Sequence, residues 1–355
     1  MFIRNCWYVA GWSSEVVAQG FLARTIIDMP LALWRREDGA VVAFEDACCH
    51  RGAPLSKGRR EGDCVRCMYH GLKFDADGQC IEIPGQDHIP PSMKVRTFPV
   101  VERSKWIWIW MGDPAKADPS LIADTHWLDD PAWRSLEGYT HYDTNYLPIA
   151  DNLLDLAHLP YVHASTLGGS EDYATNLPLV EPLERGIRVT RWAMNTMPPA
   201  FIQKVRPFAG KVDRWNIYDF TVPGIFLMDS GMGDAGGGVR EGDRSNAAMF
   251  HSCQALTPET AHATHYFFAQ PHSFAIDDAA VTRSIHQSIV EAFEEDRAMI
   301  TLQVRSLAAR PDFRMRGIRA DEALTKFRFL VDRLLQVERA GMPAVATVSA
   351  DGVSA

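Results

Sequence analysis

Two segments near the start of the chain are Cys48-Cys49-His50-Arg51 and Cys64-Val65-Arg66-Cys67-Met68-Tyr69-His70. Together they have the pattern C-x-H-x16-C-x2-H, in which each of the two short segments offers one thiolate and one imidazole. Such ligands fit either a tetrahedral zinc ion or a [2Fe-2S] cluster with two thiolates on one iron and two histidines on the other. Zinc fingers usually place a cysteine pair before a histidine pair, so one ligand of each kind per segment favours the cluster.

A second group of polar residues begins at Asn152. Asn152, Asp155 and His158 are three residues apart, so on a helix they lie close to one face. His158 and His163 are five apart, which takes them off a common face of a straight helix. Pro160 lies between them and removes a backbone donor, so the helix is predicted to distort there and bring both imidazoles to one ion. A kinked helix with two core histidines is the alternative.

Two histidines and a carboxylate form the facial triad that binds ferrous iron and leaves positions open for dioxygen. A long helix is predicted from Asp278 to about Leu307. Its apolar face carries Ile285, Ile289, Phe293, Ile300 and Val304. Asp296 falls on the same face, where a carboxylate is costly unless it binds a metal or an ion-pair partner. Glu294 and Glu295 fall on other faces and are expected to be solvated.

The two Cys-His segments, the Gly71-Leu72-Lys73-Phe74 strand and the second motif resemble the oxygenase component of Rieske non-heme iron oxygenases. The resemblance covers nearly the whole chain. The Asn5-Cys6-Trp7-Tyr8-Val9-Ala10 opening and the run from Tyr161 to Ser165 are similar to small oxygenases of the vanillate O-demethylase and toluenesulfonate methyl-monooxygenase type. Cys49 stands where this family usually has proline.

The resemblance implies an α+β fold, with a small antiparallel β Rieske domain followed by a catalytic domain whose antiparallel sheet is wrapped by helices, in a helix-grip-like arrangement. The expected segments are a Rieske domain at 1–115, a connector at 116–135, a catalytic domain at 136–340 and a flexible tail at 341–355. The implied [2Fe-2S] ligands are Cys48, His50, Cys67 and His70. The implied Fe²⁺ ligands are His158, His163 and Asp296.

In this family a head-to-tail homotrimer places the cluster of one chain beside the iron of the next. Asp155 matches the carboxylate that joins His70 of the neighbouring chain to His158, and Asn152 is expected to support the same region. The implied partners are dioxygen, a small aromatic substrate and a separate NAD(P)H reductase with a flavin and a ferredoxin-type cluster.

The implied reaction is oxidative demethylation or methyl hydroxylation of a substituted aromatic compound. Alternatives within the family are N-dealkylation and ring hydroxylation. A Rieske ferredoxin-type electron carrier would need only the first domain, and a zinc-stabilised binding protein would need no iron. The pocket candidates between the two helical regions are Phe201, Ile202, Phe226, Met228, His251 and Gln254.

Composition narrows the class further. A chain of 355 residues is long enough for two domains, and its net charge of −9 argues against nucleic acid as a partner. The most hydrophobic run, Trp106–Met111, is far shorter than the ~20 residues of a membrane helix, and no signal peptide is evident. Seven cysteines without a disulfide framework fit a reducing cytoplasm. Six basic residues between Arg51 and Lys73 form either a solvated face or a docking surface for an acidic electron donor.

Overall fold

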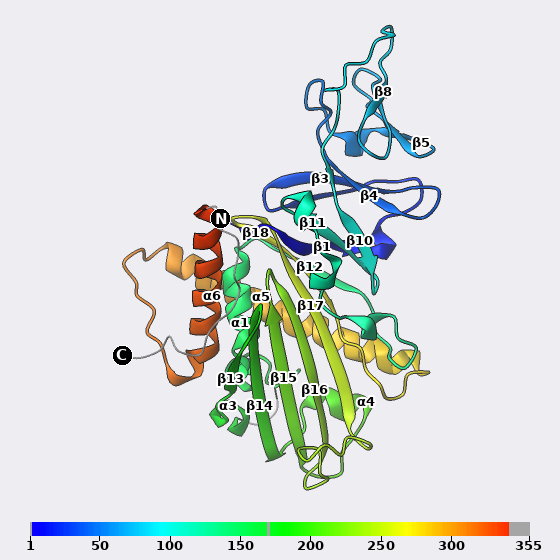
Figure 1. Ribbon diagram of the computed structural model, residues 1–355. Coiled ribbons are helices and arrows are strands. Elements are labelled where there is room, and N and C mark those ends of the chain that lie inside the picture. Colours follow the sequence, from blue (N-terminus) through cyan, green and yellow to red (C-terminus); the bar gives the residue numbers. More distant parts are fainter. Residues whose placement is uncertain (1, 169–170, 341–355) are drawn as a thin grey trace. The chain divides into compact units, whose positions relative to one another are not determined.

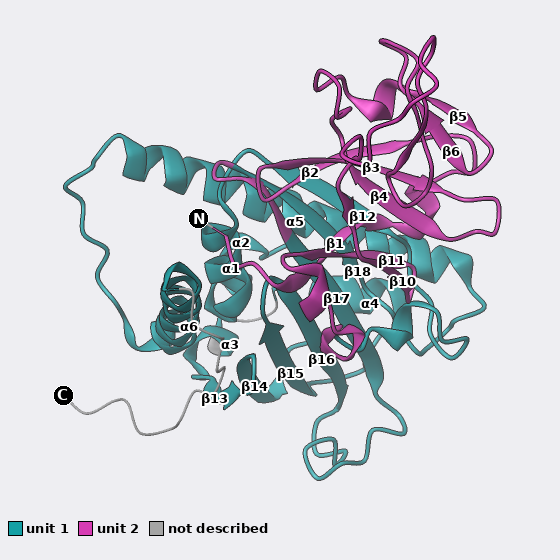
Figure 2. Ribbon diagram, turned by 45° about the horizontal axis from the view of Figure 1, so that its top comes forward, with its two compact units in different colours: residues 1, 123–256, 263–355 teal, residues 2–122, 257–262 magenta. Residues whose placement is uncertain are grey.

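The computed structural model describes residues 2–168 and 171–340, so the predicted tail at 341–355 lies outside the described residues. The chain forms two compact units, one of residues 2–122 with 257–262 and the other of residues 123–256 with 263 onward (Figure 2). Figure 1 shows the first unit as strands and loops, and the second as a large sheet with helices. None of the described helices combines the length and apolar character that a membrane span requires. The predicted α+β class is confirmed.

The first unit consists of three antiparallel sheets. The first has the order β1 (Cys6–Trp12), β11 (Trp106–Met111), β10 (Val100–Arg103). The second has the order β2 (Leu22–Ile26), β3 (Met29–Arg35), β4 (Val41–Glu45), β9 (Thr97–Phe98). The third has the order β5 (Arg59–Glu61), β6 (Cys64–Arg66), β7 (Lys73–Phe74), β8 (Cys80–Glu82). Every residue of β11 is buried, as the hydrophobic run predicts.

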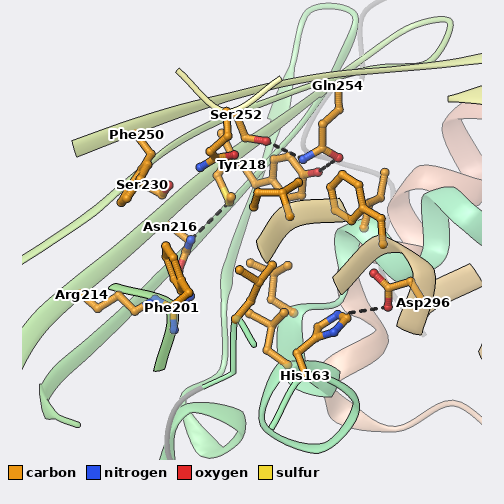
Figure 3. Close-up of a pocket in the computed structure, with 18 of the residues that line it drawn as sticks. His163, Phe201, Arg214, Asn216, Tyr218, Ser230, Phe250, Ser252, Gln254 and Asp296 are labelled. Carbon is orange, nitrogen blue, oxygen red and sulfur yellow. Dashed lines mark hydrogen bonds and ion pairs between the residues drawn. The ribbon is translucent and has the colours of Figure 1, made fainter. Parts of the chain in front are cut away.

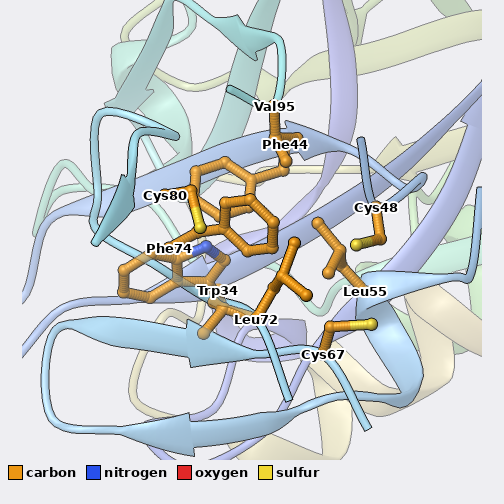
Figure 4. Packing of buried hydrophobic residues seen from close by; sticks show 10 residues of the cluster. Trp34, Phe44, Cys48, Leu55, Cys67, Leu72, Phe74, Cys80 and Val95 are labelled. Carbon is orange, nitrogen blue, oxygen red and sulfur yellow. The ribbon is translucent and has the colours of Figure 1, made fainter. Parts of the chain in front are cut away.

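The third sheet of this unit frames the Cys-His segments. A tight turn joins β7 and β8, where Asp75 accepts backbone N–H bonds through its side chain and Gly78 adopts a φ of 80°. A β-carbon at Gly78 would lie 2.3 Å from the carbonyl oxygen of Val95, so this turn requires glycine. Figure 4 shows the core beneath the turn, in which Cys48 and Cys67 pack with aromatic and aliphatic side chains.

The second unit is built on one seven-stranded antiparallel sheet of order β12-β18-β17-β16-β15-β14-β13. Its strands are β12 (Gly138–Tyr142), β13 (Leu179–Leu183), β14 (Gly186–Thr196), β15 (Val212–Thr221), β16 (Ile225–Asp234), β17 (Ala248–Thr260) and β18 (Ala263–Ala269). The stretches 187–191, 215–219 and 265–269, in which apolar and polar residues tend to alternate, lie in β14, β15 and β18. The glycine-rich stretch that starts at Gly231 belongs in its first part to the sheet, because Gly231 to Asp234 still pair with β15.

Six α-helices are described with this sheet: α1 (Tyr146–Leu154), α2 (Leu159–Val162), α3 (Asp172–Thr175), α4 (Ala200–Val205), α5 (Ala279–Ala308) and α6 (Glu322–Arg339). Short 3-10 helices are η1 (Ser13–Glu15), η2 (Leu55–Lys57), η3 (Pro114–Lys116), η4 (Pro119–Leu121), η5 (His126–Leu128), η6 (Leu156–His158) and η7 (Arg319–Asp321). Figure 1 shows α5 crossing one face of the sheet.

Helix α5 begins where the sequence predicts, because Asp278 caps it by accepting from the N–H of Ala280. The predicted apolar face is confirmed, since Ile285, Ile289 and Phe293 are buried. Phe293 packs its ring 5.0 Å from that of Tyr266 in β18. The same face includes Asp296, which this helix therefore presents toward the interior of the unit.

Candidate metal centres and substrate pocket

The two Cys-His loops share one backbone geometry. In each, the cysteine N–H donates to the carbonyl of the residue five positions on, and a glycine four positions on donates back to the cysteine carbonyl, at 2.8 to 2.9 Å. These glycines, Gly52 and Gly71, have φ values of 69° and 78°, which are strained for other residues. The chain therefore folds the segments after Cys48 and Cys67 into two matching tight turns.

Within these turns the thiols lie inside and the imidazoles outside. Cys48 and Cys67 are 3% and 1% exposed, whereas His50 is exposed and His70 is half-buried. The imidazole rings lie 4.5 Å apart between centroids. Burial, with the neighbouring Cys67, raises the pKa of the Cys48 thiol to about 12. A bound cation would offset the cost of a Cys48 thiolate, and the residues present fit a cluster with two sulfur and two nitrogen ligands.

Much of the basic excess beside these loops is neutralised within the unit. Glu61 accepts from Arg59 at 2.5 Å, from Arg66 at 2.7 Å and from Lys73 at 3.3 Å. Arg66 also pairs with Glu82 at 2.9 Å. The Arg66 hydrogen bond is the main cause of the low pKa of the Glu61 carboxyl. These contacts favour a structural role for three of the six basic residues over a docking role.

The second motif is not one helix distorted at Pro160, as the sequence predicts, but two helices separated by a break. Helix α1 ends at Leu154, and Asp155 adopts an extended conformation with φ −112° and ψ 92°. Pro160 lies in the first turn of α2, where its missing N–H costs nothing, so the prediction that proline distorts the helix is wrong. The extended residue Asp155 changes the chain direction instead. Its carboxylate accepts from the N–H of Ala157 at 2.9 Å and starts η6, which carries His158.

The rearranged segment places both histidines against α5. His158 Nε2 lies 3.5 Å and His163 Nε2 3.2 Å from Asp296 Oδ1. One ligand atom from each of the three residues lies within 4.8 Å of the others, a geometry that can hold a metal ion. His163 and Asp296 are 1% and 4% exposed. Asn152 donates from Nδ2 to Asp296 Oδ1 at 2.9 Å, so it positions the carboxylate.

Each imidazole is oriented through its other nitrogen. His158 Nδ1 lies 2.5 Å from the main-chain carbonyl oxygen of Asp155. His163 Nδ1 lies 2.7 Å from Glu295 Oε2, which also accepts from Thr166 Oγ1 at 2.8 Å. When Nδ1–H donates to these acceptors, Nε2 keeps its lone pair for a metal. The prediction that Glu295 is solvated is wrong, because His163 and Thr166, more than a hundred positions earlier in the chain, contact its carboxylate.

Electrostatics at the two histidines differ. Burial lowers the pKa of His158 despite the opposing charge of Asp296, which favours the neutral imidazole that binds metal. Burial acts on His163 in the same direction, but the hydrogen bonds and charges of Asp296 and Glu295 outweigh it and raise the pKa of His163. A metal ion would take the place of a proton between His163 and the carboxylate. Its site therefore fits a divalent cation.

A pocket opens beside the triad, between the helices and the face of the large sheet (Figure 3). The space along these residues, open solvent included, amounts to about 720 Å³. The apolar wall comprises Leu153, Leu156, Leu159, Leu167, Phe201, Met228, Met232, Phe250, Ile289 and Phe293. The polar side chains besides the triad are Asn152, Arg214, Asn216, Tyr218, Ser230, Ser252, Gln254 and Gln270.

Three of the six pocket candidates line this space, namely Phe201, Met228 and Gln254. Gln254 Oε1 accepts from the hydroxyls of Tyr218 and Tyr266 at 2.8 and 2.5 Å. His251 stacks instead on Trp127, with ring centroids 4.0 Å apart. Alternate residues of a strand point to opposite faces, so His251 belongs to the face of β17 away from the pocket.

Comparison with known proteins identifies both parts of the chain. Residues 6–99 match the Rieske [2Fe-2S] domain, and residues 142–336 match the vanillate O-demethylase oxygenase C-terminal domain. The first match decides between the zinc and cluster alternatives in favour of the cluster. The predicted [2Fe-2S] and mononuclear iron cofactors are confirmed by these matches together with the triad.

Full-length relatives agree with the two matches. The chain is 48% identical to the iron-sulfur subunit of a toluene-4-sulfonate monooxygenase system of Comamonas testosteroni, covering 96% of this chain and 99% of the relative. It is 35% identical to the dicamba O-demethylase oxygenase component of Stenotrophomonas maltophilia, with the same coverage. The crystal structure of dicamba monooxygenase bound to 3,6-dichlorosalicylic acid superposes with a TM-score of 0.89, at 35% identity over 96% of this chain and 99% of that one. The chain therefore belongs to the Rieske non-heme iron oxygenases, as an oxygenase component of the vanillate O-demethylase type.

Proposed function

We propose that this chain is the terminal oxygenase of a multicomponent monooxygenase that oxidises a methyl or methoxy group of a substituted aromatic compound with dioxygen. The observation that carries the proposal is the triad of His158, His163 and Asp296 at the wall of a largely apolar pocket. Relatives named as a monooxygenase and as O-demethylases support it. Oxidation of a methoxy carbon gives a hemiacetal that collapses to a phenol and formaldehyde, whereas an aryl methyl group gives an alcohol.

When bound, the [2Fe-2S] cluster supplies electrons one at a time and the mononuclear Fe²⁺ activates dioxygen. The chain's own residues perform the remaining tasks. His158, His163 and Asp296 hold the ion, and Glu295 keeps the His163 ring in its ligand orientation. The apolar wall excludes water and holds an aromatic ring so that one substituent points to the triad.

The cluster ligands in this proposal are Cys48, His50, Cys67 and His70, and the domain limits are 1–115 and 136–340. We infer a head-to-tail homotrimer, in which Asp155 of one chain joins its own His158 to His70 of a neighbouring chain. Support comes from the half-buried position of His70 and from the main-chain contact that already links Asp155 to His158. Asn152 holds Asp296 in the same cluster of side chains.

Electrons in this proposal come from a separate NAD(P)H reductase that carries a flavin and a ferredoxin-type cluster. Relatives named as a subunit of a monooxygenase system and as an oxygenase component support such a partner. We place the system in the cytoplasm, because none of the seven cysteines, all of which lie in the described residues, forms a disulfide, as is usual in a reducing compartment.

The test uses purified protein with a compatible reductase and NADH. The expected preparation is red-brown, holds about three irons per chain and takes up oxygen with methoxybenzoates or aryl methyl compounds. Formaldehyde release identifies demethylation, and a hydroxymethyl product identifies methyl oxidation. Oxidised products whose methyl or methoxy groups are all intact would instead favour N-dealkylation or ring hydroxylation. Electron transfer to the protein without oxygen uptake would favour an electron carrier.

A further inference from the structure

Arg214 is a buried cation in the substrate pocket. It lies on β15 together with Asn216 and Tyr218, and alternation along the strand directs all three side chains to the pocket. Arg214 is only 7% exposed. A buried guanidinium is costly unless an anion or several hydrogen bonds compensate its charge.

The partners of Arg214 are neutral. Its Nη1 donates to the carbonyl oxygen of Gly168 at 3.0 Å, and its guanidinium carbon lies 4.7 Å from the centre of the Tyr173 ring. Among the carboxylates whose side chains the structure describes, none forms an ion pair with Arg214. A guanidinium has five N–H donors, so most of its hydrogen-bonding capacity is left for a ligand.

A second buried arginine adds to the positive charge. Arg191 is 2% exposed, donates to the carbonyl oxygen of Tyr173 at 3.1 Å and lies 5.2 Å from the centre of the same ring. Arg191 lies on β14, where it pairs with Asn216 of the neighbouring strand β15. Burial is the main reason that the pKa of Arg214 is lowered, and the charge of Arg191 acts in the same direction. This end of the pocket is therefore electropositive.

Two other arginines, Arg188 on β14 and Arg244 in the loop between β16 and β17, show the contrast. Arg188 pairs with Asp219 at 2.7 Å, and Arg244 pairs with Asp229 at 2.7 Å. These two are partly exposed, yet each has a carboxylate of the chain as its counter-ion. Arg214, although far more buried, has none among the described residues. The missing anion is expected from outside the chain.

The location of Arg214 indicates which part of a ligand it meets. Figure 3 shows Arg214 on one side of the pocket, beside Phe201 and Asn216, with His163 and Asp296 on the other side. The wall between them is mainly apolar. A flat aromatic ring in this space would direct one substituent to Arg214 and a different one to the triad.

We propose that Arg214 binds the anionic group, a sulfonate or carboxylate, of an aromatic acid, and that the methyl or methoxy carbon to be oxidised lies across the ring from that group. This inference rests on the proposed function for the identity of the reaction but concerns binding alone. Guanidinium groups suit both anions, because two parallel N–H bonds match two oxygens of either group.

The test is anaerobic calorimetric titration of the intact, iron-loaded protein with matched ligand pairs. The pairs are 4-methylbenzenesulfonate with the neutral 4-methylbenzenesulfonamide, and 4-methoxybenzoate with 4-methoxybenzamide. The two pairs separate sulfonate from carboxylate recognition. The variants are Arg214→Met, Arg214→Lys and, as the control, Arg244→Met, which removes an equal charge that already has its own carboxylate partner.

Arg214→Met is expected to raise the Kd of the preferred anion by about 10- to 100-fold, the loss typical of a charge-assisted hydrogen-bonded pair. The Kd of its neutral partner should change little. Arg214→Lys should recover part of the anion affinity, because it keeps the charge without the planar fork. Arg244→Met should leave both affinities near those of the natural protein.

The inference is overturned if neither anion binds the natural protein, or if Arg214→Met weakens the anion and the neutral ligand equally, as a purely structural role predicts. If Arg214→Met does not fold, folded Arg214→Lys provides the test. The inference is then overturned if Arg214→Lys leaves the ratio of the anion and neutral-ligand affinities unchanged and the natural protein binds both ligands equally well. Charge-selective binding without turnover by the reductase-coupled system would leave the anchor in place and refute the proposed function instead.

Turnover tests the orientation separately. With the anion held at Arg214, 4-methoxybenzoate should have a higher kcat/KM than 2-methoxybenzoate, whose methoxy group lies next to the acid. Arg214→Met should reduce this preference. A faster reaction of the 2-isomer in the natural protein would contradict the proposed placement across the ring.

Discussion

Replacing Glu295 with alanine tests how the triad is held. Glu295 is the acceptor for Nδ1 of His163 at 2.7 Å, and His163 is 1% exposed, so nothing else replaces this carboxylate readily. Without it the imidazole loses the partner that selects its tautomer and fixes its ring. Iron bound by His163, His158 and Asp296 should therefore be held more weakly, while the cluster in the same chain should be unaffected.

The magnitude follows from the contacts. A hydrogen bond to a charged group contributes about 1.5 to 3 kcal/mol, and the Glu295 side chain is 32% exposed, so solvent screening favours the lower part of this range. A loss of about 1.5 to 2 kcal/mol corresponds to iron binding weakened by about 10- to 30-fold. Glu295→Gln should lose less, because the amide oxygen can still accept from Nδ1.

The assay is competition for ferrous iron against a chelator, with visible absorption of the [2Fe-2S] cluster as the internal reference for protein amount. Glu294→Ala is the matched control, because Glu294 is adjacent on α5 but exposed and paired with Arg297. Loss of that exposed pair should change iron affinity little. If Glu295→Ala holds iron as tightly as Glu294→Ala, the Glu295 contact does not control the triad and the reasoning is refuted.

Three further predictions concern electron transfer, packing and pH. Asp155→Asn should leave both metal centres loaded but slow coupled turnover by about tenfold or more, and near-normal coupled turnover would contradict the proposed bridge. Gly231→Ala should lower the free energy of unfolding, measured with denaturant, by about 1 to 3 kcal/mol, because the added carbon would lie 2.5 Å from a tryptophan ring and a carbonyl oxygen. The control Gly210→Ala should be close to neutral, because its added carbon would have no neighbour within 4 Å. The pKa of Glu102 is lowered by its hydrogen bonds to Arg35, so this pair stabilises the fold above the unfolded pKa of about 4.3 and is lost as the pH falls through the lower folded value. When the pH is lowered from 5 to 3, the free energy of unfolding of the natural protein should therefore fall by about 0.5 to 1 kcal/mol more than that of Glu102→Gln. An equal decrease in both proteins would show that the pair does not contribute.

The parts of this protein that could be predicted from sequence depend on short-range geometry. The Cys48 and Cys67 turns each close within five residues, so the spacing of cysteine and histidine already indicates that both come from one tight turn. Asp296 is similar, because a helix of known period assigns each residue to a face. Its burial on the apolar face of α5 agrees with that prediction.

The predictions that failed concern local conformations with competing explanations. Pro160 is compatible with a kink or with the first turn of a new helix, and the second occurs because Asp155 already breaks the chain. Glu295 follows Glu294 on the exposed side of the predicted helix, and sequence gives no sign that Thr166 and His163 approach it. Proline and charged residues have several favourable environments, and the neighbours decide among them.

Ligand spacing and helical period are properties of contiguous residues, so they were enough to indicate the family and to nominate candidate ligands for both metal centres. Tertiary structure alone decided which strand face lines the pocket. The first half of β15 is buried on both faces, so alternation could not separate pocket-facing Arg214 from its neighbours. The partners of Glu295 and the lack of a described counter-ion for Arg214 likewise arise from segments far apart in the chain, which meet only when the helices pack on the sheet.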